Sequence, residues 1–269
     1  MKEVLLFTPG LDSFLADFVL RRDHKKKNVE KMYINLNSLY SQYEIDFLNK
    51  LDYKNFHIYD DKLDIFTLET DTHYVPNRNM LLCAMAQAIQ DADIIYLNGT
   101  KCDRVSDNTK TFRKSLSRVL SLSSGKNVEV KSVLANKEKY SWCQYYASVY
   151  PKFDKRLKLL TNTYSCFYGD FCESDVPKKV VGVYTKLPSG KFKKRRELEH
   201  LGCLTCDACF RKLCALTGAG LYVRDISGET DKEYILHEHY IKDTSFSKKY
   251  PKRYRSIVEY FNFLKTFNN

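Results

Sequence analysis

Three cysteines in the second half of the chain are spaced as metal ligands are. Cys203, Cys206 and Cys209 form the pattern C-x2-C-x2-C, in which three thiolates wrap one ion through a tight turn. With a fourth thiolate they would make a closed tetrahedral zinc site of the structural type. The candidates for that fourth ligand are Cys166, Cys172 and Cys214. An iron–sulfur cluster is the rival interpretation, because it uses similar cysteine spacings.

A second candidate site is the segment TPGLDS, Thr8–Ser13, between a short apolar run and a stretch with helical spacing. The start of a helix presents backbone N–H groups and the positive end of the helix dipole to an anion. Gly10 permits close approach of the backbone to such an anion, and Thr8 and Ser13 supply hydroxyls. Asp12 is suited to orient Mg²⁺ or to cap the helix. An ordinary capped turn has the same features.

Residues 73–79, HYVPNRN, precede the strongest helical pattern in the chain, residues 79–90. Pro76 favours an extended entry into that helix. Arg78 is then expected beside the helix N-terminus, near the end of the predicted sheet. A capped loop with a surface arginine fits the same pattern.

The first 135 residues alternate between strand and helix patterns. Strands are predicted at residues 4–7, 31–36, 56–59, 94–97 and 128–133, and helices at 13–22, 43–51, 79–90 and 106–122. This alternation predicts an α/β fold, with a parallel sheet covered by helices on both faces. Ligands of such sheets bind at the carboxyl ends of the strands, where TPGLDS is expected to lie.

The patterns divide the chain into three parts. Residues 1–135 are predicted to be a nucleotide-binding α/β domain. Residues 136–220 are predicted to be a helical, metal-binding region with a basic β-hairpin inserted at 171–200, turning at Leu187–Gly190. Residues 221–269 are predicted to be a C-terminal extension with a helix at 254–267.

The composition favours an intracellular protein that meets anions. The 269 residues contain 44 Lys and Arg against 33 Asp and Glu, a net charge of +11. Such an excess attracts nucleotides or nucleic acid, although a lysine-rich genome explains it as well. The sequence contains no apolar run of about 18 residues, so no membrane partner is expected. In the cytoplasm, which is the expected location, nine cysteines favour metal binding over disulfides.

Taken in their order along the chain, these motifs resemble those of the 7-cyano-7-deazaguanine synthases, a branch of the PP-loop ATP pyrophosphatase superfamily. TPGLDS is similar to the SGGxDS loop of the superfamily, and VPNRN to the V-P-x-R-N segment of the family. Gly99–Asp103 resembles its G-x-x-x-D stretch, and Asn136–Glu138 its N-K-x-E segment. The matches run from about residue 3 to 168 and from 201 to 220.

The metal site shares this resemblance. NTYSCFYG and GCLTCDACFRK match the two zinc-binding segments of the family, which implies zinc and makes Cys166 the fourth ligand. The remaining thiols are then interpreted as core or incidental; they include Cys83, Cys102, Cys143 and Cys214.

The resemblance implies a Rossmann-like (PP-loop/HUP) sheet, ATP, Mg²⁺ and Zn²⁺ as cofactors, and a C–N ligase activity. A 7-carboxy-7-deazaguanine carboxylate attacks the α-phosphate of ATP, and ammonia displaces AMP to give an amide. A second ATP activates the amide oxygen, and loss of AMP leaves the nitrile. This chemistry belongs to queuosine biosynthesis, and members of the family often form homodimers.

The resemblance also assigns roles to residues. Cofactor binding falls to Thr8, Pro9, Gly10, Leu11, Asp12 and Ser13. Catalysis falls to Asp12, Ser13 and Lys137, and substrate contacts to Arg78, Asn79, Asp103 and Asp107. The metal ligands are Cys166, Cys203, Cys206 and Cys209.

The chain departs from the family in two places. Pro9 replaces the first glycine of the loop and removes one N–H donor. The family's Y-P-D-C-R-like stretch is replaced by residues 106–110, SDNTK, in which Asp107 retains an acid and Lys110 or Arg113 stands in for the arginine. Two alternatives therefore stay open: adenylation of a nucleic acid (tRNA or DNA) bound through the basic hairpin, and a degenerate PP-loop fold kept as a binding module.

Overall fold

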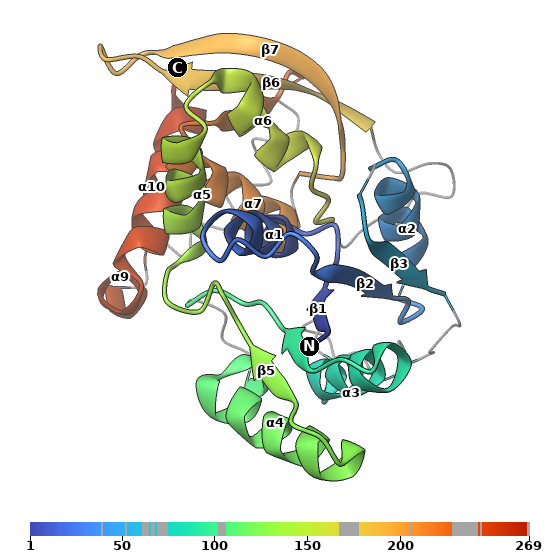
Figure 1. Cartoon of the computed structure of the whole chain (residues 1–269). Coiled ribbons are helices and arrows are strands. Elements are labelled where there is room, and N and C mark those ends of the chain that lie inside the picture. Colours follow the sequence, from blue (N-terminus) through green and yellow to red (C-terminus); the bar gives the residue numbers. More distant parts are fainter. Residues whose placement is uncertain are drawn as a thin grey trace. The chain divides into compact units, whose positions relative to one another are not determined.

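Figure 1 shows the computed structural model of the chain, which forms two compact units, Met1–Asn136 and Lys137–Asn269. The structure describes residues 1–38, 40–51, 53–60, 65, 68, 75–101, 106–166, 178–204, 206–227, 242 and 244–267. Within these ranges no helix is long and apolar enough to cross a membrane. Each unit is described by itself.

The first unit is an α/β fold, as predicted. Its elements are β1 (Glu3–Leu6), α1 (Leu11–Arg22), β2 (Glu30–Ile34), α2 (Ser41–Asn49), β3 (Phe56–Tyr59), α3 (Arg78–Gln90), β4 (Ile94–Tyr96), a 3₁₀ turn η2 (Ser106–Asn108), α4 (Lys110–Ser124) and β5 (Glu129–Lys131). The five strands pair in parallel in the order β3-β2-β1-β4-β5.

Helices cover both faces of this sheet because side chains along β2 alternate in direction. Met32 and Ile34 enter an apolar core that also contains side chains of α3 and α4, among them Cys83, Ala86, Leu116 and Leu120. On the opposite face Lys31 contacts α1 through Asp17, and Tyr33 contacts α2 through Glu44. The prediction of a sheet covered on both faces is therefore confirmed.

The strand order reverses beside β1. The chain proceeds from β1 outward to β2 and β3, and then returns to place β4 on the other side of β1. The carboxyl ends of β1 and β4 therefore flank the switch point, where open parallel sheets bind their ligands.

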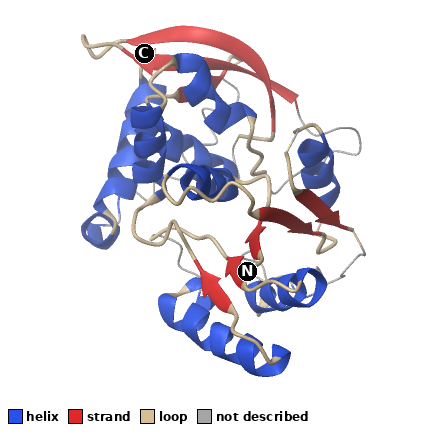
Figure 2. Cartoon of the chain, in the orientation of Figure 1, coloured by secondary structure: helices blue, strands red, loops and turns tan. Residues whose placement is uncertain are grey.

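The second unit combines helices with a small antiparallel sheet. Its elements are α5 (Lys139–Val149), α6 (Phe153–Thr161), β6 (Lys178–Lys186), β7 (Phe192–Leu201), α7 (Asp207–Leu216), a 3₁₀ turn η3 (Thr217–Ala219), β8 (Tyr222–Asp225), α9 (Thr244–Lys249) and α10 (Pro251–Lys265). The predicted hairpin is present as β6 and β7, and Figure 2 shows its long strands. The sequence patterns did not predict β8, which pairs with β6 and completes the order β7-β6-β8.

Aromatic packing holds this sheet on α10. The ring of Phe263 lies 4.8 Å from that of Phe192, and 5.3 Å from those of Tyr184 and Tyr222. The Tyr260 hydroxyl donates to the carbonyl of Val223 at 2.7 Å. The last helix thus anchors all three strands.

The buried Asp17–Lys31 ion pair offers a test of the first unit. Both side chains are buried, and Lys31 Nζ lies 3.3 Å from Asp17 Oδ1. We expect Asp17→Ala to lower the free energy of unfolding by about 3 kcal/mol, because a buried ammonium loses its counter-charge. Urea denaturation measures the loss. Asp17→Leu with Lys31→Met should recover most of it, and an unchanged stability of Asp17→Ala would contradict the assignment.

Candidate functional site

The segment after β1 folds into a tight loop closed by its own hydroxyls. The Thr8 N–H donates to Ser13 Oγ at 3.1 Å, and the two hydroxyl oxygens lie 3.3 Å apart. The Gly10 N–H points to Thr8 Oγ1 at 3.4 Å. Gly10 is also the N-cap of α1 and has no side chain to cap the first turn. This arrangement leaves the start of α1 suited to an anion.

The sequence around Gly10 accounts for this conformation. Gly10 is extended, with φ −64° and ψ 157°, and a Cβ there would lie 3.2 Å from Thr8 Oγ1. Asp12 is the one acid in the first turn of α1, where a carboxylate interacts favourably with the helix dipole. Ser13 is buried behind the loop, so its hydroxyl acts first as the internal brace of the turn.

Polar side chains also follow the neighbouring strands at the same edge of the sheet. Asn35, after β2, donates through Nδ2 to Asp60 Oδ1, after β3, at 2.5 Å. Asn98, after β4, accepts from the Val133 N–H at 3.3 Å. The sequence patterns did not single out Asn35 or Asp60. The signal that could have identified them is a polar residue directly after a buried strand.

The structure brings Asn79 and Asp107 together across 28 residues of sequence. The Asn79 N–H points to Asp107 Oδ2 at 3.5 Å, and Asn79 Nδ2 donates to the Asp107 carbonyl at 3.3 Å. Asp107 is 6% exposed, and its Oδ1 has no hydrogen-bond partner among the described residues. Burial above all, and then the charge of Asp107, raise the pKa of the Cys83 thiol to about 12.

The structure also places Arg113 and Lys110, the two candidates to replace the family's arginine. Arg113 is buried and donates to the backbone carbonyl and Oδ1 of Asn108, so it holds the loop before α4 in shape. Lys110 is exposed at the start of α4. Asp103 and Cys102, which were expected nearby, lie outside the described residues.

Arg78, the first residue of α3, interacts with an acid that the sequence patterns did not reveal. Glu44 in α2 accepts a hydrogen bond from the Tyr33 hydroxyl at 2.8 Å. Burial raises the pKa of Glu44 to about 7, against the opposing effects of that hydrogen bond and of the Arg78 charge. The helical pattern of residues 43–51 gave no sign that this glutamate is partly buried.

Lys137 lies at the start of the second unit, where its ammonium is held by aromatic rings. Its Nζ lies 4.6 Å from the ring centroid of Trp142 and 4.9 Å from that of Tyr145. Cation–π contacts of this kind hold a lysine side chain in place without neutralising its charge. Contact of Lys137 with phosphate stays a prediction.

The four predicted metal ligands converge. The sulfur atoms of Cys166, Cys203, Cys206 and Cys209 all lie within 4.8 Å of one another. Thiolates bound to one zinc ion at about 2.3 Å lie roughly 3.8 Å apart, so a small contraction of the cluster would complete such a site. Cys214 lies outside this cluster, and Cys172 lies outside the described residues.

The turn before Cys203 brings the backbone close to the thiols of the cluster. Gly202 has φ +127°, and a Cβ there would lie 3.3 Å from the Cβ of Cys166. The N–H groups of Cys203, Cys206 and Cys209 point to cysteine sulfurs at 3.3 to 3.5 Å. Hydrogen bonds among the four thiols lower the pKa of Cys203 and Cys206 and raise the pKa of Cys166 and Cys209, because the first thiolates to form are stabilised by S–H donors that remain protonated.

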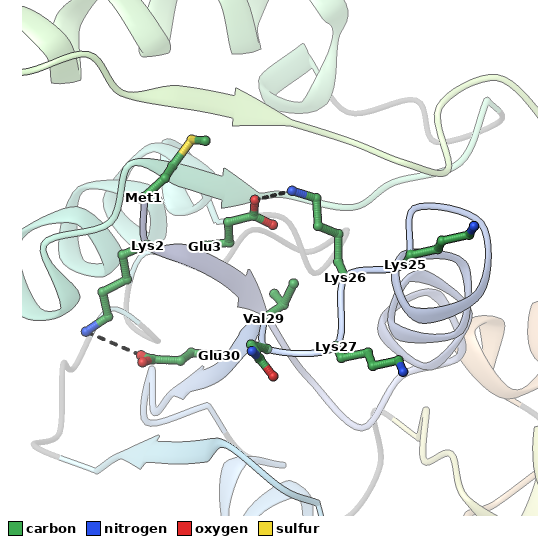
Figure 3. Close-up of a pocket in the computed structure, with 9 residues that line it drawn as sticks. Met1, Lys2, Glu3, Lys25, Lys26, Lys27, Val29 and Glu30 are labelled. Atoms are coloured by element: carbon green, nitrogen blue, oxygen red, sulfur yellow. Dashed lines mark hydrogen bonds and ion pairs between the residues drawn. The ribbon is translucent and has the colours of Figure 1, made fainter.

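A pocket of about 530 Å³ lies at the opposite, amino end of β1 and β2. Figure 3 shows two of its four lysines beside acids: Lys26 lies 2.5 Å from Glu3, and Lys2 lies 3.4 Å from Glu30. The pocket therefore lies at the opposite edge of the sheet from the loop after β1. The acids Glu3 and Glu30 offset part of the positive charge of its lysines. A nucleotide is therefore not expected there.

The sheet order and the loop after β1 define a doubly wound α/β protein with a candidate binding edge at the switch point. The same chain carries a cluster of four cysteines that could hold a metal ion. A family model described as queuosine biosynthesis protein QueC matches residues 17–220. Because this match covers well over half of the chain, the protein belongs to the QueC family and is an enzyme of queuosine biosynthesis. The match includes Arg78, Asn79, Asp107 and the four cysteines and begins after the Thr8–Ser13 loop. No curated protein matches the chain.

The cysteine cluster predicts one zinc ion per chain. We expect Cys206→Ser to lose the metal and several kcal/mol of stability, because binding of a structural ion is coupled to folding. Metal analysis of the purified protein and thermal unfolding measure both effects. Cys214→Ser, in α7 but outside the cluster, should keep its zinc. Full metal content in Cys206→Ser would contradict the ligand assignment.

Glu44 predicts a specific pH dependence of stability. Its pKa is about 7 in the folded protein against an ordinary 4.5, so the unfolded chain loses this proton first as the pH rises. The wild type should therefore lose roughly 2 to 3 kcal/mol relative to Glu44→Gln between pH 4.5 and 8. Urea denaturation of both proteins at the two pH values measures this difference. Parallel pH profiles would rule out the raised pKa.

Proposed function

We propose that the protein is an ATP-dependent 7-cyano-7-deazaguanine synthase. It would adenylate a 7-carboxy-7-deazaguanine carboxylate, aminate it with ammonia, and dehydrate the amide through a second adenylation. The observation that carries the proposal is the braced loop at the carboxyl end of β1, beside the switch point, in a chain of the QueC family. Such a loop suits the pyrophosphate that leaves when a carboxylate attacks the α-phosphate.

The phosphates would be held mainly by the start of α1. Pro9 has no N–H, and the N–H of Thr8 is used inside the loop. Donors for an anion must then come from the first turn of α1 and from its dipole. Asp12 is the group that would hold Mg²⁺, which supplies positive charge against the developing charge of the pyrophosphate. A catalytic role is also proposed for Lys137.

The substrate base would be recognised near the start of α3. A deazaguanine presents N–H donors, and a buried carboxylate oxygen such as Asp107 Oδ1 is suited to accept them. Asn79 fixes the orientation of Asp107 through two hydrogen bonds. Arg78 is placed beside Glu44 and would contact the carboxylate or the phosphate. The same substrate role is proposed for Asp103.

The zinc site would have a structural role. Four thiolates leave no open position for a substrate or water, and three of the four cysteines are buried. No step of the reaction needs this ion. Its ligands would tie Cys166, after α6, to the start of α7.

The direct test is turnover by the full chain with ATP, Mg²⁺, ammonium and 7-carboxy-7-deazaguanine, followed by mass spectrometry. We expect AMP and the nitrile, and we expect Ser13→Ala to lower kcat/KM about 100-fold, because it loses the brace that holds the loop. Ser123→Ala, an exposed serine in α4, is the matched control and should keep full activity.

Three outcomes separate the alternatives. Arrest at the amide would indicate that the altered stretch at residues 106–110 supports only the first half-reaction. AMP release only with tRNA or DNA would replace the substrate by a nucleic acid. Intact ATP with every acceptor, in protein that holds one zinc per chain, would indicate a degenerate binding module.

A further inference from the structure

Positive side chains gather where β7 meets α6 in the second unit. Nine lysines and arginines lie in or directly beside these two elements, against three acids, Asp154, Glu197 and Glu199. The nine are Lys152, Lys155, Arg156, Lys158, Lys191, Lys193, Lys194, Arg195 and Arg196. We call the surface formed by β7 and α6 the basic face.

Two contacts join the elements of the basic face, although about 40 residues separate them in sequence. The Arg195 guanidinium lies 5.6 Å from the ring centroid of Phe153, and Arg196 Nη2 lies 3.2 Å from Asp154 Oδ1. Figure 1 shows α6 alongside the β6–β7 hairpin. The sequence pattern indicated a basic hairpin but not that a second basic element packs against it.

A β-bulge contributes to this arrangement. The pairing of β6 with β7 shifts at Val183 and Tyr184, which face Arg196 and Lys194, so Arg195 is the extra residue. A bulge re-aims the side chain of the residue it inserts. At this bulge Arg195 lies over Phe153, and the next residue, Arg196, pairs with Asp154. Two consecutive arginines therefore both contact α6.

The positive charges on the basic face are close enough to repel one another. Burial and then the charge of Arg195 lower the pKa of Arg156. Lys155, Lys158 and Lys193 are exposed, and Lys194 pairs with Glu197. The face therefore keeps a net positive charge after its internal ion pairs are counted.

Protection of an edge strand explains only part of this pattern. β7 is at the edge of its sheet, and lysines on an edge strand prevent pairing with other chains. The lysines of α6 lie on a helix and therefore protect no strand edge. Stacking of Arg195 on Phe153 fixes the position of the guanidinium without neutralising its charge. Guanidinium groups held in position beside exposed lysines are suited to bind phosphates.

We propose that the basic face binds the phosphodiester backbone of a nucleic acid. Backbone binding of this kind needs positive charge spread over a surface and no base-specific pocket. The inference does not depend on the proposed enzymatic reaction, because it concerns a surface of the second unit and predicts binding alone.

The test compares two triple variants of the full chain. Lys155→Gln/Lys158→Gln/Lys193→Gln removes three exposed charges from the basic face. Lys25→Gln/Lys27→Gln/Lys50→Gln removes three exposed charges from the first unit and is the matched control. Fluorescence anisotropy with a labelled tRNA and with a DNA duplex of similar length, between 50 and 300 mM salt, gives the affinity and its salt dependence.

We expect salt-sensitive binding by the wild type. In the basic-face variant the negative slope of log K against log salt should become less steep by about 3, because each phosphate contact that is lost removes about 1 from its magnitude. The control should keep the wild-type slope. Tighter binding of tRNA or of DNA would identify the polymer. Equal losses in both variants, no binding by the wild type, or equal binding to anionic lipid vesicles would each overturn the proposal.

Discussion

The central position of β1 is the constraint on which the first unit depends. β1 pairs with β2 on one side and β4 on the other, both in parallel, so every segment that follows a strand emerges at the same edge. The Thr8–Ser13 loop, Asn35 and Asn98 reach that edge from three different strands. Pairing in parallel thus gathers polar groups that are distant in sequence, and burial of both sheet faces holds them in place.

The second unit is organised by a different constraint. Cys166 and Cys203 are 37 residues apart and meet in the four-cysteine cluster, which closes the segment between them into a loop. β6 and β7 project from this loop and need a partner for their apolar side chains, which α10 provides through Phe263. The cysteine cluster and the aromatic packing therefore constrain the same part of the chain.

Patterns in the sequence predicted the elements well where one physical signal dominates. The strand at residues 56–59 and the end of the helix at Gln90 were found because apolar periodicity and polar boundaries agree there. The strand β8, Tyr222–Asp225, was missed because it does not alternate with helices as the first five strands do, and because its partner lies about 40 residues earlier. Pairing over that distance leaves no local signal.

The candidate site shows the same division. The cysteine cluster was predictable because ligand spacing is itself a local pattern, and all four predicted ligands converge. The contacts of Glu44 with Tyr33 and of Asn79 with Asp107 depend on tertiary packing, so the residue types alone could not indicate them. The basic hairpin was visible in the sequence, whereas its contact with α6 was not.

The pairing of β6 with β8 has a consequence for the ancestry of the chain. β6 and β7 lie within the family match, whereas β8 and α10 lie beyond its end at residue 220. Aromatic rings of the hairpin and of these last elements cover one another. The hairpin and the segment after residue 220 are therefore expected to have changed together in the course of evolution.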